Sequence, residues 1–226
     1  MRASSVLCGV LGGSLAAIAA RGDLIYTSQN RFVEVATSVN EQVLTDAAED
    51  FGPFITTLTS SVIFQTPTGP AENEGTTSID CQLDPNAIIA TGSLTGAGGL
   101  NVNGNLEVGE AEAFVFVTFT ITELTPWQIL ASQRPSDNPE DEWEIELENV
   151  GTGTNIFRID ETAPPQSVNV SGMLQPGTYS IQFEVEMSVA SAEETETFDF
   201  LFAIPSPGGV SAFAVASLLA CRRRRR

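Results

Sequence analysis

The chain has 226 residues, enough for one domain of ordinary size with its own core. It contains 29 Asp and Glu residues against ten arginines, and neither lysine nor histidine. The missing histidine excludes Ser-His-Asp and Cys-His catalytic sites and histidine metal sites, and the missing lysine excludes Schiff-base chemistry.

All of the acidic residues lie between Gly22 and Ile204. That segment contains three arginines against 29 acids, so its formal charge is −26. Nucleic acids and anionic lipids are bound through cationic surfaces, and the sequence therefore predicts no nucleic-acid partner. The same charge favours solubility and attracts divalent cations, as expected of a solvated acidic surface on an extracellular protein.

Residues 1–22 have the pattern of a secretory signal peptide. Arg2 gives a positive start, and residues 6–20 are apolar or small. Ala17 and Ala19 form a small-x-small cleavage pattern, although cleavage after Gly22 is also compatible. The sequence thus predicts an N-terminal signal helix and passage through the export translocon.

Residues 205–226 form a second distinctive segment. Pro205, Ser206 and Pro207 break any preceding strand, and residues 210–221 are an apolar run of 12 residues. A membrane-spanning helix needs about 17–25 apolar residues, so this predicted C-terminal hydrophobic helix is short for a permanent anchor. Five cationic residues follow and are expected to stop in the cytoplasm: Arg222, Arg223, Arg224, Arg225 and Arg226.

This order of proline motif, apolar segment and terminal arginine cluster resembles the PEP-CTERM sorting signal of bacterial exported proteins. Ser206 replaces the glutamate of the family's Pro-Glu-Pro motif. The resemblance implies transient anchoring in the inner membrane, processing by an exosortase-type enzyme, and a final place at the cell surface or outside the cell. It also implies an association with exopolysaccharide. The alternative is an ordinary tail anchor that is never cut.

Between the termini, residues 23–204 alternate with a period of two, which is typical of β-strands. Only Glu41 to Asp50 has the composition of a helical turn, and Thr66 to Gly75 is expected to be a loop. The predicted fold is an all-β, antiparallel β-sandwich of jelly-roll-like type. The turn entry Leu174 to Tyr179 resembles one in secreted jelly-roll modules such as bacterial pre-peptidase C-terminal domains. The expected strands are residues 31–39, 54–64, 77–83, 87–94, 111–122, 126–131, 143–147, 155–159, 168–172, 179–189 and 197–203.

Residues 111–122 differ from the other predicted strands because both faces are apolar. This pattern indicates either a central strand covered on both sides or a strand at the most buried point of a sandwich. Cys81, in contrast, alternates with Ile79 and Leu83 on one face. It is the one cysteine of residues 23–204, so an internal disulfide is excluded there and we interpret Cys81 as a small core residue.

Carboxylates are the remaining candidates for chemistry. The pairs Glu144/Glu146 and Glu184/Glu186 each project from one side of one strand, so neither pair flanks a sugar bond from opposite sides. Two segments have some calcium-ligand character: Asn101–Asn105 with Glu112, which we expect to be a hairpin loop, and the acidic residues 137–142, which we expect to be a solvated loop. The sequence predicts a non-enzymatic protein without a cofactor, with weak calcium binding at most.

Two functions remain open. The first is an exported cell-envelope or extracellular-matrix protein that is delivered by its C-terminal signal. The second is a secreted carbohydrate-binding module, which requires an exposed aromatic platform. Trp143 and Tyr179 lie on predicted core faces, so Trp127 is the candidate platform residue.

Overall fold

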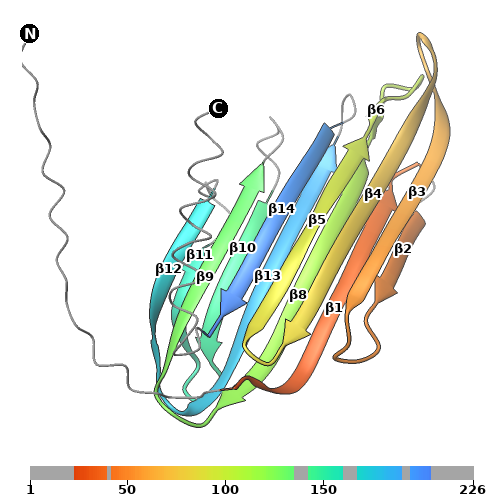
Figure 1. The fold of residues 1–226 in the computed structure, drawn as a ribbon. Coiled ribbons are helices and arrows are strands. Elements are labelled where there is room, and N and C mark those ends of the chain that lie inside the picture. Colours follow the sequence, from red (N-terminus) through yellow and green to blue (C-terminus); the bar gives the residue numbers. More distant parts are fainter. Residues whose placement is uncertain (1–22, 40–41, 135–141, 160–166, 190–193, 205–226) are drawn as a thin grey trace, which may run out of the picture.

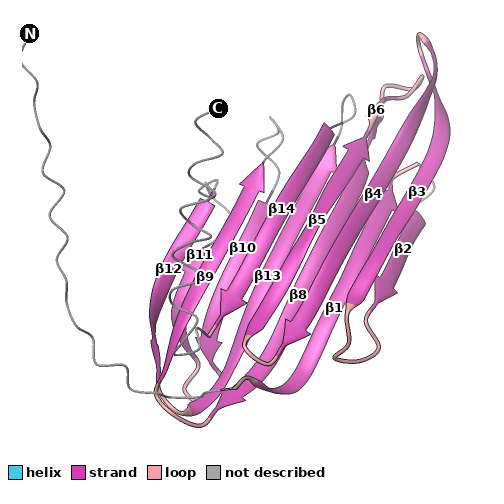
Figure 2. Ribbon diagram, viewed as in Figure 1, coloured by secondary structure: helices cyan, strands magenta, loops and turns pink. Residues whose placement is uncertain are grey.

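The computed structural model describes residues 23–39, 42–134, 142–159, 167–189 and 194–204, and every regular element among them is a β-strand (Figure 2). The predicted all-β domain is confirmed, whereas the predicted signal helix and C-terminal hydrophobic helix lie outside the described residues. The strands are β1 (Ile25–Thr37), β2 (Gln42–Ala47), β3 (Phe54–Thr66), β4 (Gly69–Asp84), β5 (Ala87–Ala97), β6 (Gly99–Leu100), β7 (Leu106–Glu107), β8 (Gly109–Ile121), β9 (Thr125–Arg134), β10 (Glu142–Asn149), β11 (Thr154–Ile159), β12 (Ser167–Leu174), β13 (Gly177–Val189) and β14 (Glu194–Ala203).

The strands form two six-stranded sheets that pack face to face (Figure 1). Sheet A has the order β11-β10-β13-β8-β1-β2, and sheet B has the order β12-β9-β14-β5-β4-β3. Each neighbouring pair is antiparallel, and β6 and β7 form a separate small hairpin. This confirms the predicted antiparallel sandwich, while its jelly-roll-like type stays a prediction.

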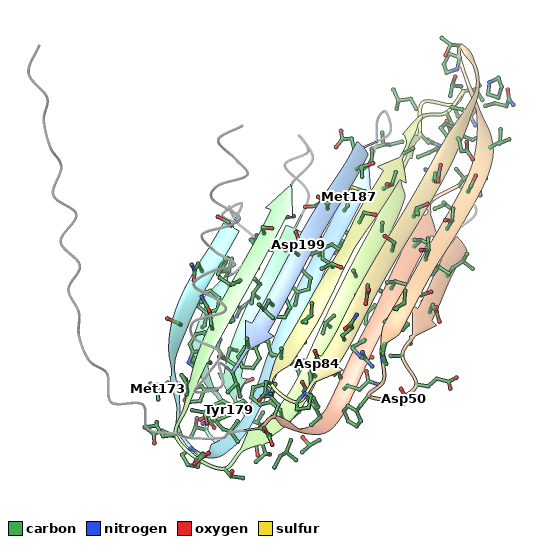
Figure 3. The ribbon with its side chains drawn as sticks, in the orientation of Figure 1. Asp50, Asp84, Met173, Tyr179, Met187 and Asp199 are labelled. Carbon is green, nitrogen blue, oxygen red and sulfur yellow. The ribbon has the colours of Figure 1, made fainter. Side chains whose placement is uncertain are left out.

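The core lies between the sheets because alternate residues of each strand point inward. On β13 the inward residues include Tyr179 and Met187, which lie toward opposite ends of the sandwich (Figure 3). Phenylalanines from both sheets interlock here: the rings of Phe183 and Phe200 stack with centroids 4.7 Å apart, and those of Phe119 and Phe202 lie 5.2 Å apart. Aromatic side chains therefore supply much of the buried apolar area.

At one end of the sandwich the two sheets touch through their backbones. A Cβ on Gly109 of β8 would lie 2.0 Å from the Glu74 carbonyl oxygen on β4, and one on Gly75 would lie 2.3 Å from the Glu110 carbonyl oxygen. No side chain fits in either space, so glycine is required for this close approach.

Two sequence-based predictions about local structure are wrong. Glu41 to Asp50 has the composition of a helical turn, but residues 42–47 are β2 and pair with β1 from Thr37 to Phe32. Pairing with β1 and packing of Leu44 against the core outweigh the weak helical propensity of this short segment.

The expected loop from Thr66 to Gly75 is a hairpin instead, because β3 runs to Thr66 and β4 begins at Gly69. Pro70 lacks a backbone N–H, but it pairs with Gln65 at a level beyond the end of β5, the strand on the other side of β4, whose last residue Ala97 lies opposite Glu74. The missing N–H of Pro70 therefore interrupts no hydrogen-bond ladder between β4 and β5. The φ of 135° at Gly69 is one that favours glycine, and the Thr66 hydroxyl donates to the Gly69 carbonyl over 2.7 Å.

Two further turns join strands that follow each other in the sequence, and the second of them confirms the predicted turn entry at Leu174 to Tyr179. Pro85 and Asn86 connect β4 to β5, and Gln175 and Pro176 connect β12 to β13. In the second turn the Tyr179 hydroxyl donates to the Gln175 carbonyl over 2.8 Å, which satisfies a hydroxyl that belongs to a buried side chain.

Candidate functional site

The most distinctive surface of the described residues is the outer face of sheet A, the side turned away from sheet B. Three partly exposed phenylalanines lie there: Phe32 on β1 and Phe114 and Phe116 on β8, together called the aromatic patch. Phe32 is in register with Phe114, and the two rings stack with centroids 4.9 Å apart and planes inclined by 26°. The patch is thus a preformed pair of rings on two paired strands.

The patch results from the unusual sequence of β8. Its inward residues are fully buried against sheet B, while Phe114 and Phe116 occupy the outward positions. Of the two structures predicted for residues 111–122, the strand at the most buried point of a sandwich is confirmed, because no described element lies over the outer side. The apolar character of both faces was the signal for this patch, but the sequence does not tell whether the second face is covered.

Hydrogen-bonding side chains border the aromatic patch on the side of β13. Gln182 is in register with Phe116, and Glu184 with Phe114. The Gln182 amide donates to Glu184 over 3.0 Å and to Glu144 on β10 over 3.4 Å. Arg158 on β11 extends this polar network, since its guanidinium lies 3.2 Å from the Glu144 carboxylate.

A row of glutamates borders the patch along the strands. Glu34, Glu112 and Glu186 are in register across β1, β8 and β13, so three carboxylates face the same side of the sheet. Burial, followed by the negative charges of Glu184, Glu186 and Glu34, raises the pKa of Glu112 to about 7. Desolvation and like charges both disfavour the ionised form, and the Glu112 carboxyl is therefore partly protonated near neutral pH.

Trp127, the sequence-based candidate for a binding platform, is buried with 6% of its surface exposed, and that prediction is wrong. It pairs with Gly172 of β12, where a Cβ would lie 2.8 Å from the indole nitrogen. The glycine leaves space for the indole to pack at the edge of the core. Trp143 and Tyr179 are buried as predicted. Tyr26 is partly buried, with its hydroxyl donating to the Ala87 carbonyl over 2.9 Å.

The two predicted carboxylate pairs lie on the outer face of sheet A, each on one strand, as expected. Arg158 contacts both members of the first pair, Glu144 at 3.2 Å and Glu146 at 3.7 Å. Glu144, Glu146 and Arg158 thus form a cluster of ion pairs on the surface of sheet A. Among the described residues, no group of three or more Cys, Asp and Glu side chains is arranged to hold a metal ion.

The asparagine-rich segment after β6 is a hairpin loop, as expected. The Asn101 side-chain oxygen accepts from the backbone N–H groups of Asn103 at 2.9 Å and Asn105 at 3.0 Å, and its amide donates to Glu107 over 2.6 Å. Glu112 lies within β8. The side chain of Asn101 thus closes the loop itself. Of the predicted acidic loop 137–142, residues 137–141 lie outside the described residues, and Glu142 is the first residue of β10.

Cys81 is fully buried in the core, which confirms its predicted role as a small core residue. Burial raises the pKa of its thiol, so the side chain stays protonated. Arg31, which is also buried, donates to the Cys81 carbonyl over 3.4 Å. The predicted signal cleavage residues, the Pro205-Ser206-Pro207 motif and the five terminal arginines lie outside the described residues and stay predictions. No helix among the described residues is long and apolar enough to cross a membrane.

Comparison with known proteins found no matching family model and no matching curated protein. Two solved structures match this chain weakly in their backbone fold. One is the enzymatically active domain of tailspike protein 4 from bacteriophage CBA120, with a TM-score of 0.24 and 8% sequence identity. The match covers 69% of this chain but 20% of the tailspike chain. The other is a carbohydrate-binding module of the β-sandwich superfamily, with a TM-score of 0.24, 12% identity and coverage of 81% of this chain and 85% of that one. Both scores are far below 0.5, so no assignment follows from either.

Proposed function

We propose that this chain is an exported, non-catalytic protein that binds polysaccharide through the aromatic patch of sheet A. The observation that carries the proposal is the stacked pair Phe32 and Phe114 on a sheet face that no described element covers, bordered by the Gln182–Glu184–Glu144–Arg158 network. Sugar rings have an apolar C–H face and a polar edge of hydroxyl groups. An aromatic surface beside amide and carboxylate groups matches both parts of such a ligand.

The arrangement favours binding over catalysis. The outer face of a sheet is open to solvent, whereas hydrolysis of a glycosidic bond needs two carboxyl groups on opposite sides of that bond. Glu144, Glu146 and Glu184 all project from the same side of sheet A. They are thus placed to accept hydrogen bonds from sugar hydroxyls.

Delivery is the second part of the proposal. The signal peptide of residues 1–22 would export the chain, and the PEP-CTERM-like segment of residues 205–226 would hold it in the inner membrane until an exosortase-type enzyme cuts near Ser206. The released sandwich would then act at the cell surface or outside the cell. Exopolysaccharide is the ligand class that fits both the patch and the sorting signal.

Binding of the purified full-length chain to a panel of neutral and acidic polysaccharides tests the patch. Phe114→Ala removes one ring of the stacked pair and should weaken binding about tenfold or more, as for truncation of an aromatic anchor. Met173→Ala is the matched control, because Met173 is 54% exposed on β12 of the other sheet. Equal binding by wild type and Phe114→Ala, or binding to none of the polysaccharides, would overturn the proposal.

A further inference from the structure

Strand β3 is an edge of sheet B with an unusual composition. It has 13 residues and pairs with β4 through an unbroken register, without a bulge. It contains no charged residue, although the chain has 29 acids. Ile55 and Ile63 are 68% and 71% exposed on it. Natural proteins protect long edge strands with charges, prolines or bulges, and β3 has none of these.

The other edges of the sandwich are shorter or protected. β2 has six residues and contains Asp46. β11 also has six residues, contains Arg158, and joins β10 through a register shift at Leu147/Glu148. β12 is uncharged, but it has eight residues and includes Gly172. β3 is therefore the one edge among the described strands that offers a long, regular, uncharged ladder of backbone groups.

The sequence of β3 is also nearly symmetric about Thr59. Of the five residue pairs at equal distances before and after Thr59 between Phe54 and Phe64, three are the same or similar, as in a strand that pairs with a copy of itself. The matching pairs are Phe54 with Phe64, Ile55 with Ile63, and Thr57 with Ser61.

We propose that β3 pairs antiparallel with β3 of a second copy of this chain, about a two-fold axis at Thr59. In that register Ile55 of each copy faces Ile63 of the other, so the two most exposed isoleucines of the strand cover each other. Phe54 likewise faces Phe64 of the other copy. Sheet B continues across the axis, and the edge backbone groups between Ile55 and Ile63 gain partners, while the Gln65 carbonyl already accepts from the Val102 N–H.

Charge favours a second copy at this edge over approach elsewhere. Residues 23–204 contain three arginines and 29 acids, so two copies repel each other on most of their surface. Asp46 on β2 lies near this edge, and its carboxylate accepts from the Thr56 hydroxyl of β3 over 2.5 Å. Two copies that meet along β3 bring together isoleucine, threonine and serine side chains with no like charges directly opposite.

The mass of the purified full-length chain in solution, measured by sedimentation equilibrium over a dilution series, tests the proposal. Wild type should show twice the mass of the chain. Thr59→Lys places two cations on the axis and should give a folded monomer. Thr91→Lys is the control, because Thr91 lies on β5 inside the same sheet. A monomeric wild type, or a dimeric Thr59→Lys, would overturn the proposal.

The register is tested by thiol cross-linking in the full-length chain with Cys8→Ser and Cys221→Ser. Residues opposite each other on antiparallel strands have Cα atoms about 4.5–5.5 Å apart, which is within reach of a disulfide. Thr59→Cys should therefore cross-link to itself.

Thr57→Cys should not cross-link to itself, since the two copies of that position are offset by four residues, about 14 Å. It should cross-link when mixed with Ser61→Cys. Self-linking of Thr57→Cys, or no cross-link at Thr59→Cys, would show that the strands do not pair in this register.

Discussion

Glu112 occupies the middle of the glutamate row, between Glu34 on β1 and Glu186 on β13. Its pKa is raised from an ordinary value of 4.5 to about 7. The folded protein therefore binds a proton between these two pH values that the unfolded chain releases. The contribution of Glu112 to the free energy of unfolding is fully present below about pH 4.5 and is lost as the pH rises to about 7. Above about pH 7 this contribution does not change further.

Glu112→Gln removes the charge and should abolish this pH dependence. At pH 8 the variant should be more stable than wild type by about 1 kcal/mol, a value reduced for solvent screening, and at pH 4.5 the two should be equal. The change corresponds to a melting temperature about 2–4 °C higher at pH 8. Thermal melts of both proteins across this pH range measure it, and Glu148→Gln is a control farther along the same face. Identical pH profiles for wild type and Glu112→Gln would contradict the prediction.

Arg31 is a second residue whose environment predicts a measurable effect. It is 1% exposed, and its guanidinium donates to the carbonyls of Asp50 over 2.5 Å and Gly52 over 2.8 Å and to the Gln29 side chain over 3.0 Å. These bonds attach the segment between β2 and β3 to β1. The guanidinium also lies 6.0 Å from the centre of the Phe54 ring.

Arg31→Ala removes a buried guanidinium that donates to three backbone carbonyls, those of Cys81, Asp50 and Gly52, and should cost about 3 kcal/mol of unfolding free energy. Arg158→Ala is the matched control, because Arg158 has 47% of its side chain exposed and should cost less than about 1 kcal/mol. Urea unfolding measures both values. Equal costs for the two substitutions would mean that the buried bonds of Arg31 contribute no more than a surface ion pair.

At the scale of elements, the close approach of β4 and β8 is the feature most sensitive to a single atom. Gly109→Ala places a methyl group where the Glu74 carbonyl oxygen lies 2.0 Å away. The sheets must separate locally, so we expect a loss of about 2 kcal/mol or more. Gly99→Ala is the control, since its Cβ would lie 3.6 Å from the Phe64 ring, an ordinary contact. A Gly109→Ala melting temperature equal to that of Gly99→Ala would contradict the prediction.

At the scale of the whole molecule, an antiparallel β3 pair would place the outer faces of sheet A on the same side of the dimer. Each copy carries one aromatic patch there. A dimer would thus present two patches to one polymer, and two linked sites bind a repeating ligand more tightly than one site does. Both proposals are needed for this effect.

The terminal segments predict a processing event. The apolar run of 12 residues is short for a permanent anchor, and the five arginines that follow it are expected to hold its end in the cytoplasm. Intact-mass measurement of the protein from its native host should show a mature chain that ends near Ile204. Deletion of residues 208–226 should release the sandwich without processing, and replacement of the five arginines by alanine should impair retention. A mature species that still ends at Arg226 would leave the tail-anchor alternative.

How much of this protein follows from its sequence depends on the range of the interaction concerned. The alternation of residues 179–189 predicts β13 and its buried face, and Cys81 between Ile79 and Leu83 predicts a core position. These patterns are local, because successive side chains of a strand point to opposite faces. The excluded chemistry is also a property of composition alone, since no fold supplies a missing histidine or lysine.

Tertiary structure decided the rest. Trp127 lies inside because Gly172, 45 residues further along the chain, leaves room for its ring, and β2 is a strand because β1 lies beside it. Phe32 and Phe114 form a patch only because β1 pairs with β8 in a register that stacks them. The edge position of β3 likewise depends on strand order. Contacts between residues far apart in sequence decide which strands are neighbours and which face of a sheet packs against the other sheet. The local alternation of side chains along one strand does not specify these contacts.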